Sequence, residues 1–323
     1  MVAISLMIEG QDGLNWSRWQ RLVTEAETLG FAGLFRSDHF TNATPPDKDS
    51  LEMIVSLTYL ADHTQRIHFG PLVSPLTFRA PQMLARQAAA LDNLSSGRMI
   101  LGLGAGWQER EHRLFGYDLG TTATRMARLE EGLEVITRLL RSDTPVTFEG
   151  KYFQLREATL LPRPQRPGGP RILVGGNGQK RTLSLVARYA DVWNALYLTP
   201  QAFHERSVAL DDLLRQSGRQ PGEVKRTMML TLLFGRDKAA LEQQLEPYRK
   251  RPELSGKSTE EIVRTLGLSG RCIIGTAEQA ERVIEQIKAY EAVGVEELMM
   301  QWFEMDDIDD LRAFASSVFP HIA

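Results

Sequence analysis

Short apolar segments of strand length alternate with longer segments of helical periodicity along the whole chain. Eight of the short apolar segments are candidate strands. Most of them are continuously apolar, which is typical of parallel strands covered on both faces. They lie at Ala3–Ile8, Gly33–Arg36, Ile67–Leu72, Met99–Gly102, Arg171–Val174, Asp191–Trp193, Met228–Leu233 and Leu298–Gln301. A helix candidate follows each strand. Eight such units in 323 residues predict a (β/α)₈ TIM barrel rather than an open sheet.

Two stretches exceed the minimal repeat. Residues 144–170 hold Val146–Phe148 and Tyr152–Leu155 on either side of Glu149-Gly150, which predicts a β-hairpin. Residues 236–270 are polar with helical spacing. Neither stretch has the composition of a linker, so we expect residues 1–323 to form a single barrel domain with these two insertions.

Composition and charge restrict the class of partner. The chain has 38 Lys and Arg against 41 Asp and Glu, a formal net charge of −3. This balance offers no basic field to nucleic acid or an anionic membrane, so a small-molecule substrate is expected. The single cysteine, Cys272, excludes an intrachain disulfide and a thiolate zinc cluster, and we expect no metal site. Without a signal peptide or a membrane-length apolar run, we expect a cytoplasmic protein.

The loop after the second strand holds a candidate acid–base pair. Functional groups of a TIM barrel lie on the loops that follow the strands. Arg36-Ser37-Asp38-His39-Phe40 puts a carboxylate beside an imidazole, which can exchange a proton near neutral pH and be oriented by that carboxylate. The alternative is that His39 only satisfies a neighbouring backbone group.

Two glycine-rich loops follow the fourth and fifth strands. In Leu101–Glu109 alternate glycines let the backbone approach a flat ligand. The run is not a Rossmann fingerprint, because the acidic residue and the βαβ spacing that the fingerprint needs do not follow it. Gly175–Arg181 leads into a helix and ends in Lys180 and Arg181. Backbone N–H groups at a helix start together with two cations predict a phosphate site. The alternative is a helix entrance with surface cations.

An ordered set of motifs resembles the luciferase-like oxidoreductases over nearly the whole chain. The motifs are Ser37–Phe40, Ser74–Arg79, Leu91–Arg98, Leu101–Trp107, Leu173–Gly178, Ala190–Asn194, Ile274–Gln279 and Met299–Phe303. Within this family the chain is most similar to oxidoreductases that use coenzyme F420, a deazaflavin. The resemblance implies a barrel that holds the cofactor at its C-terminal mouth and transfers a hydride to or from a small organic substrate. A monooxygenase that uses reduced FMN and oxygen is the alternative within the family, and a non-catalytic binder of a flavin-like ligand is the alternative outside it.

The resemblance also implies roles for particular residues. A non-proline cis peptide that supports the ring falls at Leu72–Val73, and His39 lies near the redox carbon with Asp38 setting its orientation. The residues that the resemblance implies for cofactor binding are Leu72, Val73, Ser74, Gly104, Ala105, Gly106, Trp107, Gly175, Gly176, Asn177, Gly178, Lys180, Arg181 and Asn194.

The chain departs from the sugar-phosphate dehydrogenase branch of the family at one position. That branch has a proton-donating glutamate where this chain has Trp107, which puts a sugar-phosphate substrate in doubt. Glu109, or Glu111, is then the candidate acid, and Trp107 either stacks on ring or substrate or packs in the protein. A homodimer is expected by resemblance, through barrel helices that include Trp16, Trp19 and Leu51–Leu60.

Overall fold

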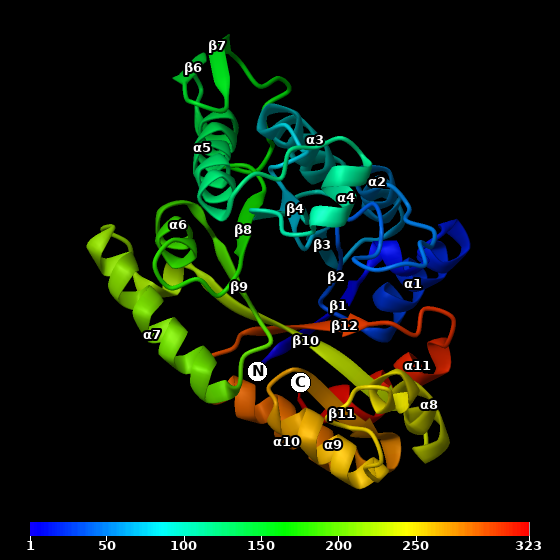
Figure 1. Ribbon diagram of the computed structural model, residues 1–323. Coiled ribbons are helices and arrows are strands. Elements are labelled where there is room, and N and C mark those ends of the chain that lie inside the picture. The colour runs from blue at the N-terminus through cyan, green and yellow to red at the C-terminus, as the bar shows by residue number, and fades with distance from the viewer. Residues whose placement is uncertain (323) are drawn as a thin grey trace.

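The computed structural model describes residues 1–322. Its main sheet has ten strands that pair in parallel and curl into a barrel, with helices around the outside (Figure 1). The strands are β1 (Ala3–Ile8), β2 (Gly33–Arg36), β3 (His68–Pro71), β4 (Ser74–Pro75), β5 (Ile100–Gly104), β8 (Arg171–Gly175), β9 (Val192–Leu196), β10 (Lys225–Gly235), β11 (Cys272–Thr276) and β12 (Glu297–Trp302).

The barrel has eight strand positions, in the order β3-β2-β1-β12-β10-β9-β8-β5-β4. The short strands β3 and β4 share one position, interrupted at Leu72–Val73. A parallel bridge from Phe69 to Met99 joins β3 to the start of β5, and β4 pairs with the end of β5, so the ring closes. The predicted TIM barrel is confirmed. Sequence periodicity missed β4 and also β11, which pairs with the C-terminal half of β10.

Helices connect the strands on the outside of the barrel. They are α1 (Trp16–Leu29), α2 (Met53–His63), α3 (Pro81–Leu94), α5 (Thr122–Arg141), α6 (Thr182–Tyr189), α7 (Pro200–Gln216), α10 (Ala280–Glu291) and α11 (Ile308–Val318). Their ends follow local chemistry: in α1 the Asn15 side chain accepts from the backbone N–H of Arg18, and Gly30 ends the helix with φ +92°. None of the described helices has the length and apolar character to cross a membrane.

The connections that exceed the minimal repeat hold elements of their own. Residues 144–170 contain the antiparallel hairpin of β6 (Val146–Glu149) and β7 (Gln154–Ala158), which projects past α5 in Figure 1. Residues 236–270 contain α8 (Lys238–Arg249) and α9 (Thr259–Leu268). The short helix α4 (Glu109–Leu114) follows β5 on the side of the barrel mouth.

One buried apolar residue from each strand position forms a layer across the barrel interior. These eight residues form a cluster separate from the larger core between barrel and helices, and they are Met7, Phe35, Leu72, Ile100, Leu173, Val192, Met229 and Met299. Such a layer closes the barrel as a packed core, not a pore. It is also the floor on which any ligand at the mouth must rest.

One residue expected at the dimer surface lies in the core instead. Trp19 is fully buried, and its indole N–H donates to the carbonyl of Ser56 at 2.8 Å. It lies on the buried face of α1, next to Leu22 and Val23. The prediction of Trp19 as an interface residue is therefore wrong, whereas Trp16 on the same helix is exposed.

The close approach of β3 to β5 predicts a large effect of Gly70→Ala. A Cβ at Gly70 would lie 1.8 Å from the carbonyl oxygen of Ile100, which belongs to the barrel backbone and has little room to move. We expect a loss of about 3 kcal/mol in the free energy of unfolding, measured from urea midpoints. Gly222→Ala is the matched control because nothing lies within 4 Å of its added Cβ. Equal midpoints for the two variants would contradict this account of barrel closure.

Candidate active site

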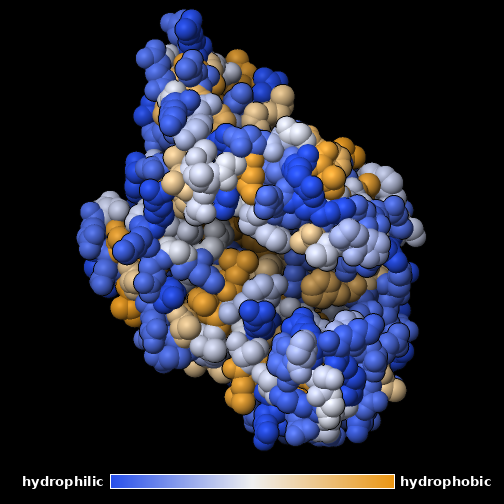
Figure 2. Space-filling view, in the orientation of Figure 1, coloured by the Kyte–Doolittle hydropathy of each residue, from blue (hydrophilic) through white to orange (hydrophobic). Residues whose placement is uncertain are grey.

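A cavity of about 390 Å³ opens at the C-terminal mouth of the barrel. This volume lies in the range of small-molecule sites. Figure 2 shows a hollow near the middle of this face, with apolar surface inside it and polar surface around it. The cavity brings together ten of the residues named from the sequence: His39, Leu72, Val73, Gly104, Ala105, Gly106, Trp107, Glu111, Gly175 and Asn194.

One wall of the cavity is apolar and lined by glycines. The peptide bond between Leu72 and Val73 is cis, as the resemblance implied. The Val73 side chain fits against Gly104 and Gly175, where an added Cβ would lie 2.5 and 3.2 Å from its methyl carbons. Gly104 must therefore lack a side chain for Val73 to take its place, and a side chain at Gly175 would crowd the valine. The result is a smooth wall that suits a flat ligand.

His39 follows β2 and faces the cavity, and its partner is Glu111. The Nδ1 atom of His39 lies 2.9 Å from Oε1 of Glu111, while the other carboxylate oxygen accepts from the backbone N–H of Phe40 at 3.0 Å. Glu111 is only 1% exposed and comes from α4. The Trp107 ring meets the His39 ring edge to face, with centroids 5.6 Å apart. This carboxylate–imidazole pair is suited to proton transfer.

Asp38 does not orient His39, which corrects the expectation from the sequence. Its carboxylate accepts from the hydroxyl of Ser74 at 2.7 Å and from two nitrogens of Arg79 at 2.7 and 3.0 Å. Consecutive residues of an extended segment point to opposite sides, so Asp38 turns away from the cavity that His39 enters. Asp38 and Ser74 are buried outside the cavity lining, where they fix the segment that carries Val73.

The environment of His39 raises its pKa. Burial alone would lower that pKa, but the hydrogen bond and charge of Glu111, with the charges of Glu9 and Asp38, outweigh burial. The protonated imidazole is therefore stabilised in the folded protein. Such a group can take up a proton during a reaction and hold it beside the substrate.

The two carboxylates considered as substitutes for the family glutamate lie in different places. Glu109, in the first turn of α4, is exposed and lies outside the cavity lining. Glu111 is buried against His39. Trp107 is 63% exposed at the rim of the cavity, so it is not a packed core residue. It presents an open aromatic surface to the mouth.

The expected phosphate loop divides into internal and open parts. Beyond Gly175 its residues do not line the cavity. The backbone N–H of Gly176 donates to Asn194, and the side-chain amide of Asn177 makes two hydrogen bonds, at 2.7 and 2.9 Å, with the backbone of Leu196. These contacts tie the loop to β9.

The end of that loop faces solvent. Gly178, Lys180 and Arg181 are exposed, and neither cation forms an ion pair within 4.0 Å among residues 1–322. Asn194 lines the cavity but is buried, and its amide donates to the hydroxyl of Thr227 at 2.9 Å. The two open cations are the ones available to an anionic ligand group.

Sequence reasoning missed a polar network across the mouth from the glycine wall. Glu9 accepts from Gln301 at 2.6 Å and from Gln11 at 2.9 Å, and the Tyr197 hydroxyl donates to Gln301 at 2.6 Å. Glu9, Gln11 and Tyr197 line the cavity. Side-chain alternation could have found Glu9 and Gln301, since they lie two residues beyond the inward-facing Met7 and Met299.

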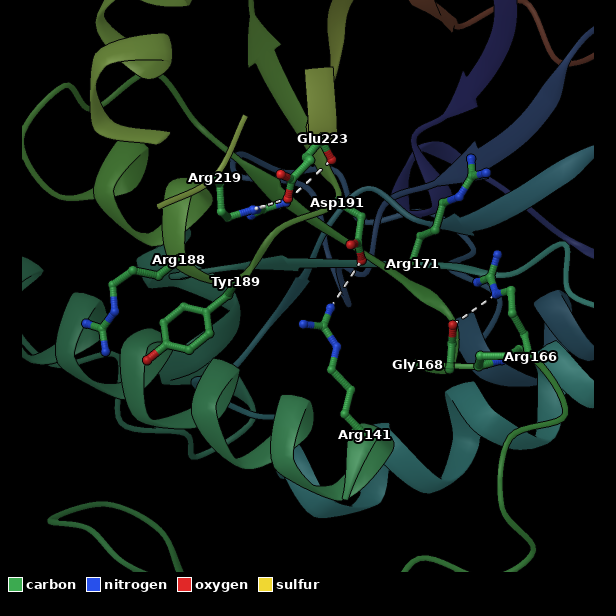
Figure 3. A pocket seen from close by; sticks show the side chains of 11 residues that line it. Arg141, Arg166, Gly168, Arg171, Arg188, Tyr189, Asp191, Arg219 and Glu223 are labelled. Atoms are coloured by element: carbon green, nitrogen blue, oxygen red, sulfur yellow. Dashed lines mark hydrogen bonds and ion pairs between the residues drawn. The ribbon is translucent and has the colours of Figure 1, made fainter. Parts of the chain in front are cut away.

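A second cavity, of about 540 Å³, lies at the N-terminal ends of the strands and is lined by five arginines (Figure 3). Four of the five have a carboxylate partner within 3.5 Å: Arg141 with Asp191, Arg166 with Asp92, Arg188 with Glu130, and Arg219 with Glu223. The head groups of Arg171 and Arg188 point away from the centre in Figure 3. The positive charge is thus largely compensated, and the mouth is the better candidate site.

The chain is similar in sequence to known proteins. F420-dependent glucose-6-phosphate dehydrogenase of Kineococcus radiotolerans is 30% identical over 312 residues, which cover 92% of this chain and 83% of the relative. The 4-hydroxyprotoasukamycin monooxygenase of Streptomyces nodosus subsp. asukaensis is 33% identical over 181 residues, 56% of this chain and 47% of that protein.

Solved structures share the fold at lower identity. An F420-dependent secondary alcohol dehydrogenase in complex with an F420–acetone adduct has a TM-score of 0.80 at 19% identity, and the match covers 98% of both chains. Monooxygenase RslO1 from Streptomyces bottropensis has a TM-score of 0.82 at 21% identity, with 100% of both chains covered. The family model for luciferase-like monooxygenases matches residues 3–297. The chain therefore belongs to the luciferase-like monooxygenase family.

Proposed function

We propose that this protein is an F420-dependent oxidoreductase that transfers a hydride between the deazaflavin and a small organic substrate. The observation that carries the proposal is the pairing of His39 with the buried Glu111 in a cavity whose far wall is smooth and apolar. The similarity to an F420-dependent dehydrogenase over 92% of the chain supports it.

The residues at the mouth fit a tricyclic cofactor with a phosphate-bearing side chain. Val73, Gly104 and Gly175 would hold the flat ring against the apolar wall. Lys180 and Arg181, exposed and free of ion pairs among the described residues, would bind the phosphate. When bound, F420 supplies the site that accepts or donates a hydride.

The protein contributes proton handling and orientation. Because Glu111 occupies Nδ1 of His39, Nε2 is the atom available to the substrate. In alcohol oxidation Nε2 accepts the hydroxyl proton as the carbonyl forms, and in reduction it returns a proton to the carbonyl oxygen. The Glu111 carboxylate stabilises the imidazolium, which is the product of proton uptake in oxidation and the proton donor in reduction.

We further propose that two copies pair through the face formed by α1, α2 and α3. Trp16, Val55 and Met83 are exposed there, on helices that lie side by side in Figure 1. Exposed apolar side chains on adjoining helices are a common basis for a symmetric interface.

The cofactor preference is tested by titrating the purified protein with F420 and with FMN and following the absorbance of each. We expect tight binding of F420 and weak binding of FMN. Tight FMN binding with weak F420 binding would favour the second candidate, a flavin-dependent monooxygenase, which the 33% identity to a monooxygenase supports. Tight F420 binding without turnover on any alcohol or carbonyl would favour a non-catalytic binder.

The role of Glu111 predicts a shift in pH dependence. If His39 is the base in alcohol oxidation, activity rises as pH passes its pKa, which Glu111 raises. Glu111→Gln should therefore move this limb of the kcat/KM profile to lower pH, and His39→Ala should lower turnover by roughly 10²–10⁴. Glu109→Gln, on the exposed side of α4, should leave the limb in place. A limb that moves in Glu109→Gln and not in Glu111→Gln would refute the assignment.

The phosphate assignment is tested with Lys180→Ala. A partly exposed charge contact contributes on the order of 1 kcal/mol, so the dissociation constant for F420 should rise about five- to tenfold, and more at low salt than at high salt. Lys288→Ala removes an exposed lysine at the C-terminal end of α10 and should change nothing. A deazaflavin that lacks the phosphate should bind wild type and Lys180→Ala equally. Equal losses for both ligands would mean that the loop shapes the barrel instead.

A further inference from the structure

Glu9 lies across the mouth from the glycine wall. Around the barrel, β1 is four strand positions from β8, and β12 is four from β5. Glu9 follows β1, and its partner Gln301 belongs to β12, so both stand opposite Gly175 and Gly104. A flat ligand on the glycine wall therefore leaves the Glu9 side of the cavity to the second reactant.

The Glu9 carboxylate is held in place by neutral donors only. One oxygen accepts from the amide of Gln301 and the other from the amide of Gln11. Gln11 is fixed in turn by the hydroxyl of Ser37 at 2.8 Å, and Gln301 by the hydroxyls of Tyr197 and Thr231. Among residues 1–322 no cation lies within 4.0 Å of Glu9. Its negative charge is oriented but forms no ion pair, and it lines the cavity.

The rest of the cavity does not compensate this charge. Neither lysine nor arginine is among its lining residues, whereas Glu9 and Glu111 both are, with His39 as the one group that can become positive. The nearby Arg36 is buried and bound to the carbonyl of Ser37 and the hydroxyl of Ser56, and Arg79 is paired with Asp38. A phosphate or carboxylate on the substrate would meet repulsion here and find no guanidinium or ammonium to bind it.

We propose that the site accepts a neutral or cationic alcohol, or the matching carbonyl compound, that carries a second hydroxyl or an ammonium group, and that Glu9 is the residue that sets this preference. The inference rests on the proposed function and narrows it. The second donor of the substrate binds the free lone pairs of Glu9 while its reacting oxygen faces His39. Anionic substrates, sugar phosphates among them, are excluded by charge.

The test uses three secondary alcohols of similar size that differ in charge: 1-amino-2-propanol, 1,2-propanediol and lactate. Their dissociation constants are measured by ligand-observed NMR on the F420-bound protein. We expect the amino alcohol and the diol to bind more tightly than lactate. Glu9→Gln, which removes the charge and keeps the shape, should weaken binding of the amino alcohol by about five- to tenfold and strengthen binding of lactate.

Glu281→Gln is the matched control. It makes the same change in net charge at an exposed position on α10, and it should leave the three constants unchanged. The proposal would be overturned if lactate bound wild type as tightly as the diol does. It would also be overturned if the three dissociation constants of Glu9→Gln kept the wild-type order and ratios. Failure of all three alcohols to bind would overturn it as well.

The same series separates this inference from the proposed function. If the protein does not bind F420, the proposed function fails, and the three alcohols measured on cofactor-free protein still test the charge preference. A second readout needs no ligand: Glu9 raises the pKa of His39, so the Glu9→Gln variant should show a lower His39 pKa by NMR. An unchanged His39 pKa would place the Glu9 charge too far away to act on a substrate held by His39.

Discussion

Side-chain alternation along the barrel strands determines where the groups of the candidate site that come from β1 and β12 lie. Residues two apart on a strand point to the same side, so several inward-facing residues of the apolar layer are followed two positions later by one that faces the mouth. Met7 is followed by Glu9 and Met299 by Gln301, with the apolar member buried in the floor. Because eight packed side chains close that floor, a ligand at the mouth meets the upper layer directly. Charges in this layer therefore act on it at short range.

Two walls with different chemistry follow from this arrangement. On one side the chain omits side chains, at Gly104 and Gly175, so that Val73 can face the cavity. On the other side it places a carboxylate supported by two amides. His39 lies between these walls, and the hydrogen bond and charge of Glu111 raise its pKa. A flat cofactor and a hydrogen-bonding substrate thus find separate surfaces, with the acid–base residue within reach of both.

Local patterns predict the barrel but only part of the site. The eight strand positions, the glycine run and His39 follow from periodicity and from the rule that functional groups lie after the strands. The partner of His39 does not, because Glu111 lies 72 residues away in the chain and reaches the cavity only through the orientation of α4. The role of Asn177 also depends on a contact that the sequence does not show. The sequence suggests that this loop asparagine contacts the ligand, but its side-chain amide is hydrogen-bonded to the backbone of Leu196. That residues 1–323 form a single domain stays a prediction.

The central claim is that a deazaflavin ring lies on the glycine wall with His39 at its centre and Glu9 left free for substrate. A crystal structure of the protein soaked with F420 tests it most directly. The account predicts the ring in contact with Val73, Gly104 and Gly175, the phosphate near Lys180 and Arg181, and an open space between the ring and Glu9. A ring bound against Glu9, or outside the barrel mouth, would contradict it.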